Sequence, residues 1–380
     1  MVVHLINTKD DFIKIYLSNK YKISVDSLSN LSLEIRGLAQ HTLLSLKDKF
    51  NNLKIKFALK DELNNSNSLL ILNNPEFVYE ILKDGKFDSD LNQFLDFVSN
   101  YFNNKQIVYN VDDKILDFNK TYLMGILNVT PDSFSDGGKY LNPSEAIKKA
   151  LEMIDDGVDI IDIGGESTRP GSDFVTLEEE KRRIIPVIEE LLKIKSDLII
   201  SVDTTKSEIA RLALEYGVKI INDISAMTLD ENMIEVCKKF NPIVILMHMK
   251  GIPKTMQNNP TYDEIISDIY DYLYERTSLI KTKGLSKIII DPGIGFGKSI
   301  DDNFNIIKRL NEFKGLGYPI LIGLSRKSFI GKTLNLDLNQ RDFPSSILEA
   351  ISIIKSARII RTHNIKNGRV VIDLLNKILS

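Results

Sequence analysis

Eight short aliphatic segments, separated by helix-like stretches, constrain the fold of this chain more than any other feature of its sequence. The segments are 122–129, 158–163, 198–202, 218–221, 243–247, 287–290, 319–324 and 358–360. Continuous apolar strands that alternate with helices are typical of parallel sheets covered on both faces. Eight such units over roughly 260 residues favour a (β/α)8 barrel, the TIM-barrel architecture, over an open doubly wound sheet, which stays the alternative.

The first 105 residues differ in amino-acid composition from the rest of the chain. They are poor in glycine and contain a single proline, Pro75. Runs 53–59 and 68–72 predict strands, whereas 9–20, 34–50 and 76–103 show broken helical periodicity. We predict a small α/β extension domain over residues 1–105 and a catalytic domain over 106–380. Alternating runs within 107–118 predict a β-hairpin that plugs the bottom of the barrel.

The amino-acid composition excludes several classes of function. A net charge of −3 gives no basic field for nucleic acid or anionic membrane. The single cysteine, Cys237, excludes an intramolecular disulfide and a multi-cysteine zinc site. No signal-peptide core follows the first residues, and no apolar run is long enough to span a bilayer. We therefore expect a cytoplasmic protein without nucleic-acid or membrane partners.

Polar residues follow every aliphatic segment. In a barrel the carboxyl ends of the strands surround the active site, so these residues are the candidates for chemistry. They include Asn128, Asp203, Asn222, His248, Asp291, Lys327, Arg361 and His363. His248 is equally compatible with a buried structural residue. The glycine-rich segment 293–299 fits neither a Walker A loop nor a dinucleotide fingerprint, because Pro292 and Lys298 stand where glycines are required.

The strand-end motifs resemble those of the dihydropteroate synthase family. The first is segment 123–138, the second is 162–171, and the others are Ser201-Val202-Asp203-Thr204, Ile221-Asn222-Asp223-Ile224, Leu246-Met247-His248-Met249, segment 291–298, Ser325-Arg326-Lys327-Ser328 and Arg361-Thr362-His363. The resemblance covers 106–380 and implies condensation of 7,8-dihydropterin-6-ylmethyl diphosphate with 4-aminobenzoate, which gives dihydropteroate and pyrophosphate. It also implies Mg²⁺ and a homodimer.

The resemblance assigns roles to individual residues. Asp203, Asn222 and Asp291 would accept hydrogen bonds from the pterin edge, Lys327 would bind its carbonyl side, and Arg361 would stack on the ring and face the diphosphate. Thr168, Arg169 and His363 would hold the diphosphate, Asn128 would be the Mg²⁺ ligand, and Phe134, Thr168, Pro170 and Ser328 would line the aminobenzoate pocket. Lys327, Arg361 and Asp203 are the predicted catalytic residues of a dissociative substitution.

Two departures from the family pattern stand near the C-terminus. Segment 341–346 replaces an Arg-Leu-x-Gly-Ser pattern and is expected to lie outside the substrate cavity, and Asn364 replaces a frequent aspartate. Two other functions stay open. One is the pterin-binding domain of a corrinoid-dependent methyltransferase, which has no use for a diphosphate site. The other is a non-catalytic binding protein, which would not need Lys327, Arg361 and Asp203.

Overall fold

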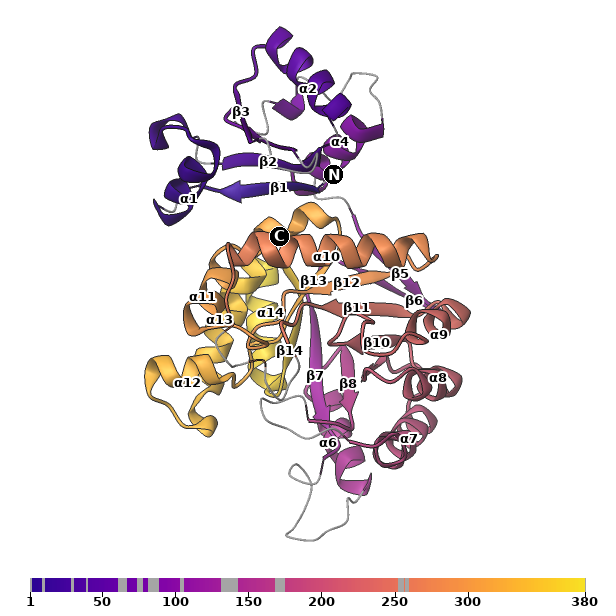
Figure 1. Ribbon diagram of the computed structural model, residues 1–380. Helices are drawn as coiled ribbons and strands as arrows, with labels where there is room; N and C mark the ends of the chain where they lie inside the picture. The colour runs from indigo at the N-terminus through magenta and orange to yellow at the C-terminus, as the bar shows by residue number, and fades with distance from the viewer. Residues whose placement is uncertain are drawn as a thin grey trace. The chain divides into compact units, whose positions relative to one another are not determined.

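The protein divides into two compact units in the computed structural model (Figure 1). The first contains Met1–Lys105 and Asn311–Gly317, and the second contains Gln106–Leu310 and Tyr318–Ser380. The structure describes residues 2–8, 11–28, 31–38, 40–60, 67–73, 78–80, 89–102, 106–130, 143–167, 175–251, 256 and 260–379. The segment Asn311–Gly317, which falls within the predicted catalytic domain, thus groups with the first unit.

The first unit is built on a four-stranded antiparallel sheet in the order β1-β2-β4-β3. Its strands are β1 (Val2–Asn7), β2 (Leu31–Leu38), β3 (Phe57–Lys60) and β4 (Asn67–Ile71), and its helices are α1 (Asp11–Tyr21), η1 (Val25–Ser27), α2 (Gln40–Asn52) and α4 (Ser89–Phe102). Helix α1 buries Ile13, Leu17 and Tyr21, which stand four residues apart on one face. The helix expected over 34–50 is wrong for 34–38, because these residues belong to β2, and α2 begins only at Gln40.

The segment Asn311–Gly317 completes this unit. It overlaps the 3₁₀ helix η2 (Leu310–Leu316). Glu312 Oε2 lies 3.2 Å from His4 Nε2, and both side chains are buried. Asn311 donates to the Tyr101 hydroxyl at 2.8 Å. A Cβ on Gly315 would overlap the ring of Phe97, so only glycine permits this approach.

The second unit contains the barrel. Its eight parallel strands close in the order β10-β11-β12-β13-β14-β7-β8-β9, as expected from the aliphatic segments (Figure 1). They are β7 (Tyr122–Asn128), β8 (Ile160–Gly164), β9 (Ile200–Asp203), β10 (Ile220–Asp223), β11 (Ile243–Met247), β12 (Ile288–Asp291), β13 (Ile320–Ile322) and β14 (Ala357–Thr362). Most of their residues are buried, because the barrel core covers one face and helices cover the other. The predicted TIM barrel is therefore confirmed.

Helices follow the strands around the barrel (Figure 1). Those with described bounds are α6 (Pro143–Asp155), α7 (Leu177–Ile194), α8 (Ser207–Tyr216), α9 (Met233–Phe240), α10 (Ile265–Thr282), α11 (Ile300–Lys308), α12 (Ser328–Leu334), the short η3 (Leu338–Gln340), α13 (Asp342–Ile354) and α14 (Ile365–Leu379). Ser299 and Asp302 form a capping box at the start of α11, which fixes where the preceding loop ends. Within the described part of the chain, no helix is long and apolar enough to cross a bilayer.

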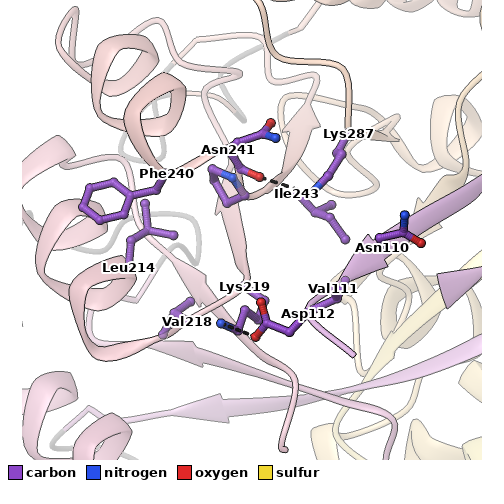
Figure 2. A pocket seen from close by; sticks show the side chains of 11 residues that line it. Asn110, Val111, Asp112, Leu214, Val218, Lys219, Phe240, Asn241, Ile243 and Lys287 are labelled. Atoms are coloured by element: carbon purple, nitrogen blue, oxygen red, sulfur yellow. Dashed lines mark hydrogen bonds and ion pairs between the residues drawn. The ribbon is translucent and has the colours of Figure 1, made fainter. Parts of the chain in front are cut away.

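A hairpin closes the amino-terminal end of the barrel, as predicted. Its strands β5 (Val108–Val111) and β6 (Lys114–Asp117) pair antiparallel. Their buried side chains share one core cluster with the first residues of β8, β10 and β11. The Tyr109 hydroxyl donates to the Ile288 carbonyl at 2.7 Å. A hollow of about 220 Å³ lies beside the hairpin, and Lys219 Nζ lies 2.6 Å from Asp112 Oδ2 at its edge. Figure 2 shows the side chains that line it.

Candidate active site

The carboxyl ends of the barrel strands lie level with one another. The register places Asn128 beside Gly164, Gly164 beside Asp203, and Asp203 beside Asn222. These strand ends surround a cavity of about 420 Å³ at the end of the barrel opposite the hairpin. Eight of the predicted site residues line it, namely Asn128, Asp203, Asn222, Asp291, Lys327, Ser328, Arg361 and His363.

Four predicted site residues lie outside the described part of the chain. They are Phe134, Thr168, Arg169 and Pro170. The loops that carry them follow β7 and β8 in the sequence. Their assigned roles therefore stay predictions.

The floor of the cavity is a network of buried acidic and basic groups centred on Arg361. Arg361 Nε donates to Asp162 Oδ2 at 2.6 Å, and Nη2 donates to Asp203 Oδ2 at 2.7 Å. Asn222 Nδ2 donates to the same Asp162 oxygen at 3.1 Å. Asp162 is fully buried and was not among the predicted site residues. The sequence feature that could have identified Asp162 is that it is the only charged residue within β8.

Burial makes the floor carboxylates hard to ionise. It raises the pKa of Asp203 to about 7, because the nearby charge of Arg361 offsets only part of the lost hydration and Asp162 adds repulsion. Burial also raises the pKa of Asp291, although the Gly293 amide donates to Asp291 Oδ1 at 2.7 Å. Buried carboxylates that have lost their hydration are stabilised strongly by a ligand that supplies N–H donors. The floor is thus suited to the donor-rich edge of a planar heterocycle.

Lys327 and Phe296 form one wall of the cavity. Lys327 Nζ lies 4.3 Å from the centroid of the Phe296 ring, which is a cation–π contact. Burial and the nearby charge of Arg361 together lower the pKa of Lys327 to about 8, against the opposing charges of Asp291 and Asp203. The lysine therefore carries its charge over most of the neutral range. Phe296 was not predicted as a site residue, since a single aromatic in a glycine-rich loop has no distinctive pattern.

Ser325, His363 and Asn128 provide further polar groups in the same cavity. Ser325 Oγ lies 3.1 Å from the backbone nitrogen of His363 and 3.0 Å from its Nδ1. A Cβ built on Gly164 would lie 3.8 Å from Asn128 Oδ1 and 3.5 Å from Asp203 Cβ, so glycine keeps open space between them. No group of three acidic, histidine or cysteine side chains able to hold a metal occurs among the described residues.

Segment 341–346 was expected outside the cavity, and this expectation is wrong for Arg341. Arg341 lines the cavity, and its guanidinium donates to the carbonyls of Leu336 and Arg326. Arg326 is neutralised by Asp342, with contacts of 2.6 and 2.9 Å.

The two departures from the family pattern are in direct contact. Asn364 Nδ2 donates to Asp342 Oδ2 at 3.0 Å. Asp342 therefore supplies a carboxylate next to the position where the family often has an aspartate.

Comparisons with known proteins identify relatives of the barrel. The family of pterin binding enzymes matches residues 124–363. The dihydropteroate synthase of Haemophilus influenzae is 42% identical over 256 residues, which are 67% of this chain and 92% of the relative. A structure of the Yersinia pestis dihydropteroate synthase with a sulfonamide drug complex has a TM-score of 0.68 at 37% identity and covers 72% of this chain and 99% of its own. The Xanthomonas albilineans enzyme with 4-aminobenzoic acid also has a TM-score of 0.68, at 35% identity, and covers 73% of this chain and 99% of its own.

Proposed function

The chain belongs to the pterin-binding enzymes and functions as a dihydropteroate synthase in folate synthesis, and on that premise we propose how its residues carry out the reaction. The reaction joins the methylene carbon of a 7,8-dihydropterin diphosphate to the amino nitrogen of 4-aminobenzoate and releases pyrophosphate. The single observation that carries the assignment of roles is the floor network, in which Asp162 and Asp203 hold Arg361 beside Asn222.

The pterin lies on this floor. Its 2-amino and N3–H groups donate to Asp203 and Asp291, and Asn222 completes the set of polar partners. Lys327 donates to the pterin carbonyl, and Arg361, held flat by two carboxylates, stacks on the ring. Support for this placement comes from the burial of the acidic groups, since donors from the ligand replace water that the site excludes.

The diphosphate lies on the side of Asn128 and His363, and Thr168 and Arg169 keep their predicted role of binding it. Asn128 offers a hard amide oxygen, the kind of ligand that Mg²⁺ prefers, and such an ion usually completes its shell with phosphate oxygens and water. The donor set therefore fits Mg²⁺ bound together with the substrate. When bound, the ion supplies charge neutralisation for the leaving pyrophosphate.

The substitution is dissociative. His363 and Arg361 stabilise negative charge on the leaving group, while the electron-rich pterin ring supports the cationic methylene carbon. The aryl amine is already neutral at physiological pH, so its attack needs no strong general base. The new bond is C–N, the broken bond is C–O, and the amine proton leaves to water.

The aminobenzoate lies nearer the mouth of the cavity, beside Ser328 and Arg341. The Arg341 guanidinium has only carbonyl partners among the described residues, whereas Arg326 is neutralised by Asp342. The carboxylate of 4-aminobenzoate is therefore the counter-charge for Arg341. Phe134, Thr168 and Pro170 would line the rest of this pocket.

A homodimer forms through α13 and α14. These neighbouring helices expose apolar rows at helical spacing, composed of Phe343, Ile347, Ile351 and Ile354 on one and Val370, Leu374 and Ile378 on the other. An exposed apolar surface of this extent is unusual for a monomer, and it can pair with the same surface of a second copy about a two-fold axis. Light scattering of the purified protein tests this, with Phe343→Glu combined with Ile378→Glu expected to give monomers.

Release of pyrophosphate from the pterin diphosphate, measured with and without 4-aminobenzoate, tests the reaction. We expect release that depends on 4-aminobenzoate and on Mg²⁺ and that yields dihydropteroate. Binding of the pterin without any release of pyrophosphate would instead point to the methyltransferase-type or non-catalytic alternatives. Fractionation of the source cell tests the proposed cytoplasmic location.

A further inference from the structure

Lys298, at the end of the loop between β12 and α11, is a buried lysine that the mechanism does not use. Its Nζ lies 3.0 Å from Nδ1 of His248, and it donates to the His248 carbonyl at 3.3 Å and to the Phe296 carbonyl at 3.0 Å. None of these three partners is a carboxylate. Burial lowers the pKa of Lys298 to about 7, and the charge of Asp291 opposes this shift.

These bonds define the state of His248. When Lys298 is an ammonium group it only donates, so Nδ1 then accepts and the ring proton lies on Nε2. Burial, together with the charges of Lys298 and Lys250, lowers the pKa of His248 to about 2. The rings of Tyr272 and Tyr262 lie 5.0 and 6.0 Å from the imidazole. His248 is therefore a fixed, neutral acceptor of the barrel wall.

The glycines of the same loop allow it to lie directly against the loop after β11. Gly293 and Gly297 have φ of +73° and +64°. A Cβ on Gly293 would overlap the His248 carbonyl, and a Cβ on Gly297 would overlap the Lys250 carbonyl. Backbone approach, and not a nucleotide, explains the glycine-rich segment. Lys298 and the glycines together hold the two loops in one arrangement.

The third acceptor of Lys298 connects it to the cavity. The carbonyl it binds belongs to Phe296, whose ring lies 4.3 Å from the Lys327 ammonium. The neighbouring residue Gly295 lies close to the aliphatic stem of Lys327. A Cβ built on Gly295 would lie 3.2 Å from Lys327 Cδ. Burying an ammonium is costly, but an apolar side chain of similar volume would leave the two carbonyls without the donor that Lys298 supplies. The lysine thus fixes the position of the Phe296 carbonyl.

We propose that Lys298 is a positioning residue that holds the Phe296 ring against the Lys327 ammonium and so sets the orientation in which Lys327 meets the pterin. The proposal rests on the proposed role of Lys327. It assigns Lys298 no contact with substrate. Its effect passes through the backbone of Phe296.

A double-mutant cycle tests this route. Lys298→Met, Phe296→Leu and the double variant are compared in kcat/KM for the pterin diphosphate and in the Kd of a non-reacting pterin measured by calorimetry. We expect each single variant to lose about 2- to 30-fold, the range of a cation–π contact. The double variant should lose no more affinity or kcat/KM than the more impaired of the two single variants, because both changes remove the same contact. Losses that multiply, or wild-type values in Lys298→Met, would overturn the proposal.

Two further variants separate positioning from general stability. Arg309 forms a buried ion pair with Glu264 at 2.6 Å, and Arg309→Met should lower Tm without changing either pterin constant. If Lys298→Met does not fold, Lys298→Gln keeps a donor for the Phe296 carbonyl, and it should retain more pterin affinity than Phe296→Leu. Less affinity in Lys298→Gln would count against the proposal. Wild-type protein that binds pterin but releases no pyrophosphate would contradict the proposed function alone, since the calorimetric cycle still reports on Lys298.

Discussion

Replacement of Asp203 by asparagine should lower kcat/KM for the pterin diphosphate about 10- to 150-fold. The change removes a charged acceptor that lies 2.7 Å from Arg361 Nη2 in a buried site. A hydrogen bond to a charged group contributes about 1.5–3 kcal/mol, and about 1.4 kcal/mol corresponds to a factor of ten. The new amide would also turn a donor toward the donors of the pterin edge.

Asp223 provides the matched control. It is also buried, at the end of β10, but its Oδ1 accepts from the amide and hydroxyl of Ser225 at 2.7 and 2.6 Å, and it does not line the cavity. Asp223→Asn should therefore lower Tm with little change in kcat/KM. Calorimetry with a non-reacting pterin decides the point. Unchanged pterin affinity in Asp203→Asn, or equal losses in both variants, would refute the reasoning.

The pH dependence of kcat/KM provides a second test of the role of the Asp203 carboxyl. Because the pKa of Asp203 is raised to about 7, the group becomes protonated as the pH falls below neutrality. The protonated form accepts less well, so kcat/KM for the pterin diphosphate should decline from pH 8 to pH 6 in the wild type. This decline should be absent in Asp203→Asn. The same slope in both proteins would assign it to another group.

Four other changes have expected outcomes. Arg361→Lys keeps the charge but loses the planar fork that meets two carboxylates, so kcat should fall at least about tenfold in a pyrophosphate assay. Arg341→Gln should raise KM for 4-aminobenzoate about tenfold but not KM for the neutral 4-aminobenzamide. Burial raises the pKa of Glu349 to about 7, so the folded protein favours the protonated carboxyl. The free energy of unfolding is therefore unaffected at low pH and falls as the pH rises to 7 and Glu349 must ionise. Glu349→Gln should therefore raise Tm at pH 8 and leave it nearly unchanged at pH 5. Glu312→Ala removes the contact with His4 and should lower Tm while kcat/KM stays at the wild-type value.

The barrel was predictable because each of its strands is an unbroken aliphatic run, a pattern that burial on both faces imposes. The first unit was harder to predict. In β2 the residues Leu33, Glu34 and Ile35 are all fully buried, so the strand contains a buried charge where sequence reasoning expects an exposed one. Glu34 is possible there because Lys20 and Tyr21 bind it at 2.9 and 2.8 Å. Such partners, distant in sequence, give no local pattern.

The site was predictable to the extent that its residues end strands. Asp203, Asn222 and Asp291 stand at such ends, and all line the cavity. Asp162 lies inside a strand, and Arg341 reaches the cavity from a segment that follows a helix, so strand-end reasoning missed both. Their roles depend on contacts with Arg361 and with the turn at Arg326, which only the folded chain brings together.

The placement of Asn311–Gly317 within the first unit has a consequence for synthesis on the ribosome. Met1–Lys105 is translated before the barrel, but the residues that complete this unit are translated more than 200 positions after Lys105. At about 5–20 residues per second, roughly 10–40 s of elongation separates the two. During that time the emerging unit lacks Glu312 opposite His4 and the backbone that packs on Phe97. Its folding therefore finishes only after most of the barrel has been translated, although most of its own residues are made before the barrel.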